Sequence, residues 1–484
     1  RDDLVTGVQT CALPICKAFL SSFPLTSNGK LDKKALPDVD GSALSSKEYV
    51  APETEIEQQL AESWQELLGV EKVGVHDNFF ELGGHSLLSV RLISRIQEIG
   101  YTTTIRDLFS YPTIAQLSTR LSPAEDAYQV PANGIVPGCK YITPSMVTLA
   151  DLSQEELETV MDQVPGGAAN IQDIYPLSPL QQGIYFHHLM SDRTTGDPYV
   201  IPRLVAFPSH EKREEFIEGV RFVIGRHDVF RTGVLSEGFP QAIQVVLREV
   251  DLKVEELSVD TDQEILPQVE KEIAPDRLWI EPSQAPMLQV KIADDAANGD
   301  YYLILNYHHL LMDHIGLEMV QHEVMMYVAG KADQLPTPAL YRDFIGDTLN
   351  EDKIAASKKY FTELYENIET PTYPFSLSDT KVDGTTQIVT FRETLSPELR
   401  DAVRKVSSDL RISPAVIFHA AFGLVVSRCS DSEYALFGSV LLGRLQGSKG
   451  SESSLGLFMN TLPVLLDLRS EEHTSELQSP DHLV

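Results

Sequence analysis

The chain has 484 residues, of which 42% are hydrophobic and 23% are charged, a composition typical of soluble globular domains. Asp and Glu total 71 against 39 Lys and Arg, and the resulting net charge of −32 argues against nucleic-acid binding. No apolar run reaches the roughly 18 residues that predict a membrane-spanning helix. The four cysteines include no CxxC pair, which favours a reducing, cytoplasmic location over a disulfide scaffold.

The two ends of the chain match a single oligonucleotide. Residues 5–15 read VTGVQTCALPI and residues 469–479 read RSEEHTSELQS. Both can be back-translated to a common sequencing adapter, one from each strand. We therefore expect residues 1–16 and 469–484 to be translated adapter and exclude them from the fold prediction.

Residues 17–46 contain FPLTSNGKLDKKAL, followed by a stretch rich in Ser, Gly and Asp that is typical of a linker. Asn28 and Gly29 predict a turn before Lys30, whose ammonium group suits a site for carboxylate and phosphate. The motif resembles the last motif of an adenylation domain of nonribosomal peptide synthetases. The resemblance implies that Lys30 contacts the activated amino acid. Because only the tail of such a domain is recognisable, we expect no adenylation activity.

Residues 48–121 have helical periodicity and contain DNFFELGGHSLLSVRLISRI. Two glycines interrupt the pattern, and apolar residues then recur on one helical face, which predicts a helix that begins at or near Ser86. A helix N-terminus favours an attached anion. Ser86 is therefore either a plain N-cap or a serine that carries a phosphodiester.

The wider pattern of this region resembles a peptidyl carrier domain, an all-α fold of four helices. The matching pieces are TEIEQQLAESWQELLGV, the GGHS segment and TIRDLFSYPTIAQLSTRL. The resemblance implies that a phosphopantetheinyl transferase moves 4′-phosphopantetheine from coenzyme A to Ser86. The thiol of that arm would then hold an aminoacyl or peptidyl thioester.

Residues 122–170 are rich in Pro, Gly and acidic residues, which predicts a linker. Within it, Ser153 and Glu156 form the signature of a capping box and predict one short helix.

Residues 171–468 alternate strand-like and helical patterns, and LILNYHHLLMD predicts a buried strand that runs into a loop. The segments DIYPLSPLQQG, RHDVFRT, YHHLLMDH, YRDF and LGLFMNTLPV occur in that order. Together they resemble the motifs of a condensation domain, an α/β fold like that of chloramphenicol acetyltransferase. The resemblance also implies that the second lobe is incomplete at the end of the chain.

The resemblance implies amide formation between two thioester-bound substrates, with His309 as the catalytic histidine and His308 in a structural role. A histidine in this position can hold the amine proton and assist the tetrahedral intermediate. Asp313 is expected to orient the loop through an arginine, for which Arg226 and Arg231 are the candidates. A lone His-His pair without a third ligand at metal spacing favours no metal site.

Two features resemble the branch of the family that both epimerises and condenses. His314 stands where the usual motif has Gly, and FHHLMSDRTTGDPYV is similar to that branch's extra motif, with a longer spacing before Gly196 and Asp197. In this interpretation His309 removes the α-proton and His188 supports it. The alternatives are condensation without epimerisation, or a non-enzymatic thioester carrier beside an inactive partial condensation domain. Neighbouring synthetase modules are the expected partners.

Overall fold

The computed structural model describes residues 49–84, 86–123, 129–368, 370–377, 391–410, 412–443 and 454–469. Lys30 and the predicted adenylation tail lie outside the described residues, as do both predicted adapter segments apart from Arg469. The chain divides into two compact units, Arg1–Ala127 and Tyr128–Val484.

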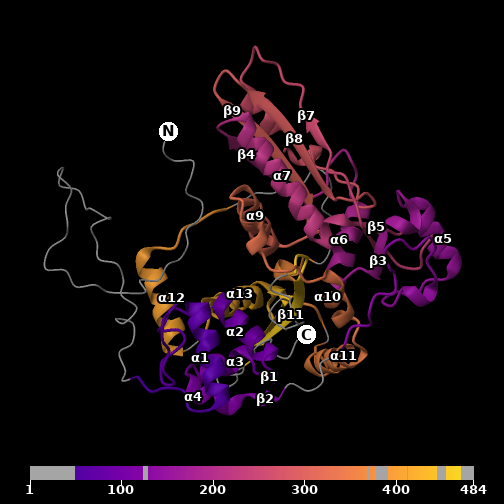
Figure 1. Cartoon of the computed structure of the whole chain (residues 1–484). Coiled ribbons are helices and arrows are strands. Elements are labelled where there is room, and N and C mark those ends of the chain that lie inside the picture. Colours follow the sequence, from indigo (N-terminus) through magenta and orange to yellow (C-terminus); the bar gives the residue numbers. More distant parts are fainter. Residues whose placement is uncertain are drawn as a thin grey trace. The chain divides into compact units, whose positions relative to one another are not determined.

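The first unit is a small helical domain. Its helices are α1 (Glu55–Leu68), α2 (Ser86–Glu98), α3 (Ile105–Ser110) and α4 (Ile114–Leu117), followed by the 3-10 turn η3 (Ser118–Arg120) (Figure 1). Helix α1 begins at a capping box between Thr54 and Glu57 and ends at Gly69, which adopts a φ of 66°. The buried Trp64 of α1 meets the ring of Phe79 edge to face, with the centroids 5.0 Å apart. This contact lies in the apolar core of the unit.

A short strand pair makes the first unit less purely helical than the sequence predicts. Strand β1 (Tyr101–Thr102) pairs antiparallel with β2 (Ser122–Pro123). The pair joins the segment that leaves α2 to the segment that follows η3. Four α-helices and this ladder make up the described regular structure of the unit, together with η3.

The described residues of the second unit form two sheets of at least three strands. Strands β3 (Ile171–Pro176), β6 (Ile243–Leu247) and β5 (Thr232–Leu235) form an antiparallel sheet in the order β3-β6-β5. Strands β4 (Val200–Phe207), β9 (Asp300–His308), β8 (Leu288–Asp295) and β7 (Val254–Glu256) form the other in the order β4-β9-β8-β7, where β7 is parallel to β8 (Figure 1). Helices α6 (Pro179–Met190), α7 (His210–Arg226), α8 (Ile265–Lys271) and α9 (His314–Val328) accompany these strands.

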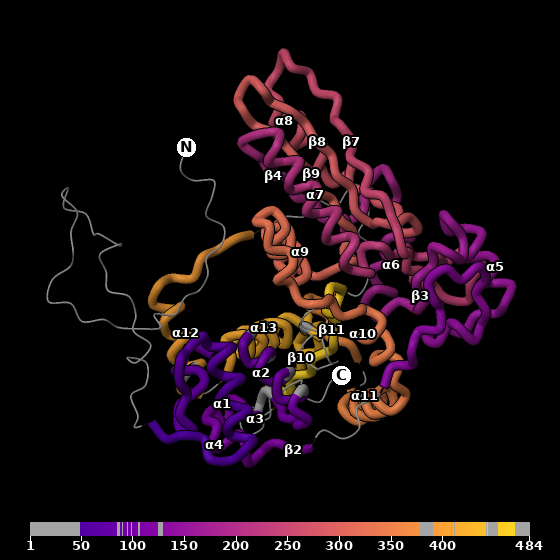
Figure 2. The backbone as a smooth tube through the Cα atoms, in the orientation of Figure 1, coloured from indigo at the N-terminus to yellow at the C-terminus, as the bar shows by residue number. Residues whose placement is uncertain are grey.

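Strand β9 is buried on both faces, which confirms the strand predicted from its apolar run. Leu303 and Leu305 join a core that includes side chains of α7 and α9. The alternate residues Tyr302 and Ile304 join a second core with side chains of α8. Figure 2 shows α7 running along the four-stranded sheet. The strand therefore holds its C-terminal end, where the histidine pair begins, between two packed layers.

Residues 129–170, predicted as part of a linker that contains one short helix, pack against the three-stranded sheet of the second unit. Helix α5 (Gln154–Gln163) begins at the predicted capping box of Ser153 and Glu156. Leu157 and Val160 of this helix are fully buried against Ile171 of β3. Apolar side chains placed between the Pro and Gly residues thus add a layer to the three-stranded sheet, and composition alone did not reveal it.

The remaining described elements are α10 (Tyr341–Thr348), α11 (Glu351–Leu364), α12 (Pro397–Leu410), α13 (Pro414–Ser430), β10 (Tyr434–Leu442) and β11 (Met459–Asp467). Strands β10 and β11 pair antiparallel along their full length. Phe458, just before β11, packs against Tyr341 and Phe344 of α10, with ring centroids 5.5 and 4.6 Å apart. The incompleteness of the second lobe stays a prediction.

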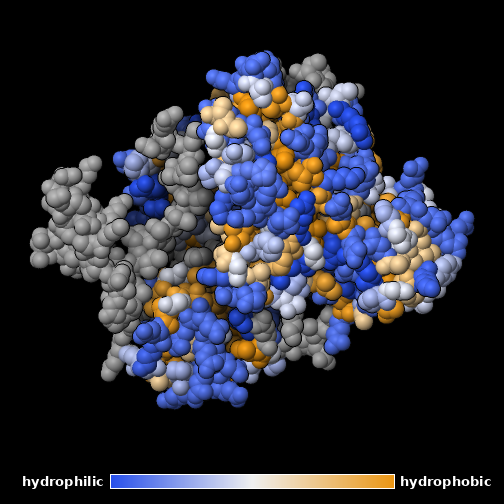
Figure 3. Space-filling view, turned by 45° about the horizontal axis from the view of Figure 1, so that its top comes forward, coloured by the Kyte–Doolittle hydropathy of each residue, from blue (hydrophilic) through white to orange (hydrophobic). Residues whose placement is uncertain are grey.

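The described helices include none with the length and hydrophobicity needed to cross a bilayer. On the face shown in Figure 3, hydrophilic and hydrophobic side chains are interspersed.

Candidate functional site

Ser86 is the first residue of α2, as the sequence predicts. The two preceding glycines have different structural reasons. Gly83 adopts a φ of 107°, which side chains disfavour. A Cβ on Gly84 would lie 2.3 Å from the ring of Phe79, so this residue must be small for the backbone to pack against the core. The glycine pair therefore lets the chain turn over Phe79 and start α2 at Ser86, where the helix N-terminus offers partial positive charge.

The histidine pair lies where β9 ends and the loop to α9 begins. His308 is the last residue of β9, and its backbone N–H donates to the carbonyl of Met287 at 3.1 Å. The backbone N–H of His309 donates to the carbonyl of Tyr199 at 2.8 Å. Leu310 and Leu311 are buried in the core, so the loop is fixed on both sides of the pair. The His309 side chain is partly exposed, and its Nδ1 is buried without a hydrogen-bond partner among the described residues.

Asp313 orients the loop as the N-cap of α9. Its Oδ1 accepts a hydrogen bond of 2.8 Å from the backbone N–H of Gly316, and the residue is 1% exposed. The two arginines proposed as its partners have other contacts. Arg226 donates to Glu323 at 2.9 Å, and Arg231 donates to Gln172 at 2.8 Å. This cap at the start of α9 is one contact that requires an acceptor side chain at position 313.

Asp197 connects two histidines that are far apart in the sequence. Its Oδ2 lies 2.6 Å from Nδ1 of His188 on α6 and 3.1 Å from Nε2 of His308. Its Oδ1 accepts a hydrogen bond of 2.8 Å from the backbone N–H of Tyr199. Asp197, His188 and His308 are all nearly fully buried. The sequence motif includes Asp197, but its pattern alone predicted no role for this residue. The position of Asp197 in the same motif as His188 was the sequence feature that could have indicated one.

The protonation states follow from these contacts. Burial by itself would raise the pKa of the Asp197 carboxyl, but hydrogen bonds from His188 and His308 outweigh burial and hold that pKa well below its ordinary value. Burial lowers the pKa of His308, although Asp197 opposes the shift. At neutral pH the cluster therefore holds an ionised Asp197 and a neutral His308.

The same three residues, His188, Asp197 and His308, could offer one ligand atom each to a metal ion, with the atoms within 4.8 Å of one another. Two ligands of a tetrahedral zinc ion with bonds of 2.0–2.1 Å lie about 3.3 Å apart. The 2.6 Å between Asp197 and His188 is shorter and is a hydrogen-bond distance. The geometry therefore favours hydrogen bonding over metal coordination.

The other predicted motifs form the framework around this loop. Arg342 of YRDF donates to Asp173 of DIYPLSPLQQG at 2.5 Å, and both side chains are buried. Asp228 of RHDVFRT accepts from the backbone N–H of Tyr341 at 3.2 Å. Gln181 of α6 donates to the carbonyl of Leu310, next to the histidine pair, at 3.0 Å. These contacts join motifs more than 100 residues apart and so hold α6, α10 and the loop in place.

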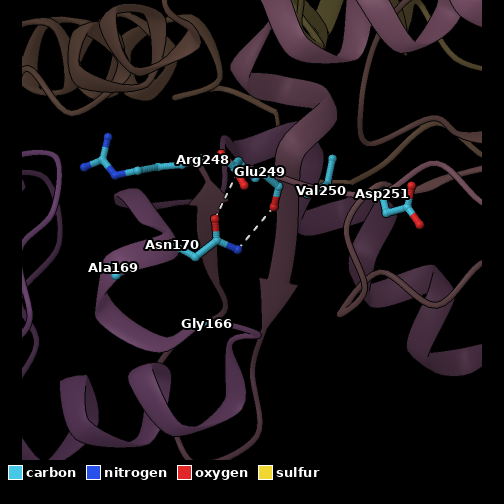
Figure 4. Close-up of a pocket in the computed structure, with 7 residues that line it drawn as sticks. All are labelled: Gly166, Ala169, Asn170, Arg248, Glu249, Val250 and Asp251. Carbon is cyan, nitrogen blue, oxygen red and sulfur yellow. Dashed lines mark hydrogen bonds between the residues drawn. The ribbon is translucent and has the colours of Figure 1, made fainter.

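A shallow pocket elsewhere in the second unit contains no predicted site residue. It is lined by Gly166, Ala169, Asn170, Arg248, Glu249, Val250 and Asp251 (Figure 4). The Asn170 side chain accepts from the backbone N–H of Glu249 at 2.9 Å and donates to its carbonyl at 3.1 Å. The Asn170 side chain thus links its own segment to the backbone of Glu249, which is a structural role.

Comparison with known proteins identifies the class of both units. The model of the condensation domain family matches residues 171–479, and that of the phosphopantetheine attachment site matches residues 58–121. The chain therefore belongs to the condensation domain family and carries a domain to which 4′-phosphopantetheine is covalently attached. This pair of domains identifies it as nonribosomal peptide synthetase sequence.

Similar curated proteins are large synthetases of Mortierella alpina. The chain is 37% identical to malpibaldin synthetase over 471 residues, covering 97% of this chain and 8% of that protein. It is 39% identical to malpinin synthetase over 480 residues, covering 99% of this chain and 6% of that protein. The chain thus spans less than a tenth of each relative.

The epimerization domain from the third module of tyrocidine synthetase B has a similar fold. It aligns with a TM-score of 0.51 at 15% identity, covering 63% of this chain and 70% of that chain. At this identity the likeness concerns the fold alone.

Proposed function

We propose that this chain works within a longer synthetase and forms a peptide bond between thioester-bound substrates. Ser86 carries the phosphopantetheine arm, which a phosphopantetheinyl transferase attaches from coenzyme A. The arm holds an aminoacyl or peptidyl group as a thioester, and neighbouring modules supply and receive the chain. The observation that carries this proposal is the presence of an attachment domain and a condensation domain in one polypeptide.

In the condensation step, the amine of one substrate attacks the thioester carbonyl of the other. A C–N bond forms, the C–S bond breaks, and the thiol of the pantetheine arm leaves. His309 accepts the amine proton and can return a proton to the departing sulfur. The partial exposure of its ring supports this role. Asp313 contributes by capping α9 and thereby fixing the loop that follows the histidine pair.

We further propose that the domain inverts the α-carbon of the carrier-bound residue before condensation. His309 removes the α-proton, and a proton delivered from water to the opposite face gives the other configuration, with His188 in a supporting role. The link from His188 through Asp197 to His308 supports this proposal, because it ties the extra motif to the histidine pair. The alternative, condensation without epimerisation, uses the same His309. Lys30 stays a prediction for the adenylation tail.

The test uses the full-length protein with its carrier domain loaded with an L-aminoacyl arm. Peptide formation in a single turnover, lost in both Ser86→Ala and His309→Ala, would support the condensation proposal. In deuterated water, exchange of the substrate α-proton and a D-configured product would support epimerisation. An all-L product without exchange would leave condensation alone, and no peptide in the unsubstituted protein would contradict the whole proposal.

A further inference from the structure

We infer that Asp197 is a positioning residue of the condensation site, which fixes the ring tautomers of His188 and His308 and the backbone at His309. This inference rests on the proposed function, because it concerns the placement of the proposed catalytic histidine. Asp197 lies in the loop before β4, His188 lies on α6, and the histidine pair lies at the end of β9. One carboxylate thus joins three separate elements at the point where the chemistry is proposed.

The hydrogen-bond pattern at His308 determines its tautomer. The backbone N–H of Leu310 donates to Nδ1 of His308 at 3.1 Å, so this nitrogen must carry a lone pair. The ring proton is therefore on Nε2, which faces Oδ2 of Asp197 at 3.1 Å. Because the carboxylate can only accept, Nδ1 of His188 at 2.6 Å must also carry a proton. Asp197 consequently selects opposite tautomers in the two rings.

A second path leads from Asp197 to His309 through the backbone. Oδ1 of Asp197 accepts from the N–H of Tyr199 at 2.8 Å. The carbonyl of Tyr199 in turn accepts from the N–H of His309 at 2.8 Å. The backbone N–H of Asp197 is itself held by the carbonyl of Leu278 at 2.8 Å. The loop of Asp197 is therefore anchored, and both residues of the histidine pair depend on its carboxylate.

Three N–H donors converge on this one side chain, from His188, His308 and Tyr199. Only a side chain whose polar atoms all accept hydrogen bonds, such as a carboxylate, can bind these three donors at once. An asparagine at position 197 would place its NH₂ group either against the Tyr199 N–H or against the two rings. In the first case two donors face each other, and in the second at least one ring must change its tautomer or turn away.

The experiment measures the ring nitrogens of the full-length, phosphopantetheine-loaded protein with ¹⁵N-labelled histidine. The unsubstituted protein should show His308 protonated at Nε2 and His188 protonated at Nδ1, with both N–H protons protected from exchange. In Asp197→Asn, at least one of these resonances should be lost or shifted. In metal sites, loss of the outer partner that orients a ligand histidine costs about 10–100-fold in activity, and we take the same order of magnitude for this hydrogen-bonded site. We expect kcat for condensation to fall by about that factor, with little change in KM.

The matched control is Asp192→Asn, which makes the same substitution at an exposed aspartate of the same loop. Asp192 accepts from backbone N–H groups that an amide oxygen can also serve, so this variant should match the unsubstituted protein. Unchanged resonances and unchanged kcat in Asp197→Asn would overturn the inference. If Asp197→Asn does not fold, the spectrum of the unsubstituted protein still tests the inference. His308 without a proton on Nε2, or His188 without a proton on Nδ1, would contradict the inferred hydrogen bonds to Asp197.

Two further outcomes distinguish a failure of the proposed function from a failure of this inference. If His309→Ala retains full condensation activity while the tautomers are as stated, the proposed function fails but the hydrogen-bond network stands, and Asp197 loses its positioning role. If Zn²⁺ removes the N–H resonances and chelation abolishes activity, the cluster is a metal site, and the inference is overturned.

Discussion

The buried pair of Asp173 and Arg342 offers a quantitative test of how the sequence motifs hold the second unit together. Arg342 of α10 donates to Asp173 of β3 at 2.5 Å, and the side chains are 5% and 7% exposed. Arg342 also donates to Thr148 at 3.0 Å and to the carbonyl of Pro131. Arg342→Met replaces the arginine with an apolar side chain of similar length and removes all of these hydrogen-bond donors. Asp173 then stays buried but loses its counter-charge.

Breaking a buried ion pair by removing one partner costs about 3–5 kcal/mol. This is a large fraction of the 5–15 kcal/mol that is typical for the unfolding of a domain. The double variant Asp173→Asn/Arg342→Met removes both charges and keeps an acceptor for the Ile174 N–H that Asp173 now binds. We expect it to recover at least half of the loss. Arg221→Met, which breaks the exposed Arg221–Glu218 pair, should cost less than about 1 kcal/mol.

The loss in Arg342→Met should depend on pH. Burial raises the pKa of Asp173 above its ordinary value of 3.8, and Arg342 opposes this shift only in part. Without Arg342 the pKa in the folded state rises further. A carboxyl whose folded pKa is raised stabilises the fold below its unfolded pKa and loses that contribution as pH rises through the folded pKa. The deficit of the variant should therefore be small near pH 4 and reach its full size at neutral pH.

Urea unfolding followed by tryptophan fluorescence measures these values. The chain has two tryptophans, Trp64 in the first unit and Trp279 in the second. In a Trp64→Phe background the signal reports the second unit alone, which avoids mixing two transitions. A loss below about 1 kcal/mol in Arg342→Met, or a double variant as unstable as the single one, would refute the reasoning.

Three further variants test other parts of the structure. Trp64→Ala should cost about 3–5 kcal/mol, enough to unfold the small first unit, seen as loss of hydrogen-exchange protection there while the second unit is unchanged. Gly84→Ala should cost about 1–3 kcal/mol through its clash with Phe79 and slow phosphopantetheine attachment. Gly69→Ala also loses stability because of its φ of 66°, but nothing lies near its Cβ, so the attachment rate of the folded protein should be unchanged. Although burial opposes it, hydrogen bonds from His227 and the charge of Arg226 lower the pKa of Glu323 below 4.5. The unsubstituted protein should therefore lose stability as pH falls below about 4.5, and Glu323→Gln should remove that part of the acid sensitivity.

Local patterns predicted local structure well. The apolar run before the histidine pair predicted a buried strand, and β9 is buried on both faces. The glycines and the periodic apolar residues around Ser86 predicted the start of α2. Ser153 and Glu156 predicted the cap of α5. Each of these signals lies within a few residues of the feature that it predicts, so the chain itself contains the necessary information.

Long-range contacts were not accessible in the same way. The hydrogen bond between Asp197 and His308 spans 111 residues, and the pair of Asp173 and Arg342 spans 169. The sequence named Arg226 and Arg231 as partners of Asp313 because they are motif arginines, but their contacts lie with Glu323 and Gln172. Which charged groups meet depends on the packing of the elements, and periodicity does not encode it.

The packing of the predicted linker segment was also not accessible from the sequence. Pro, Gly and acidic residues recur throughout residues 129–170, yet apolar side chains between them pack the segment against β3. Leu157 and Val160 are fully buried although the helix that carries them has a mostly polar sequence. Composition averages over a segment, whereas burial depends on single positions.

In the proposed function, His309 provides the proton transfer in peptide-bond formation. The most direct measurement is the single-turnover rate of condensation in the full-length, phosphopantetheine-loaded protein, with and without His309→Ala, at equal carrier loading. General-base catalysis by a positioned histidine contributes about 10²–10⁴-fold, and the rate should fall by that factor. A rate within about twofold of the unsubstituted protein, from a variant whose unfolding curve is unchanged, would contradict the role of His309.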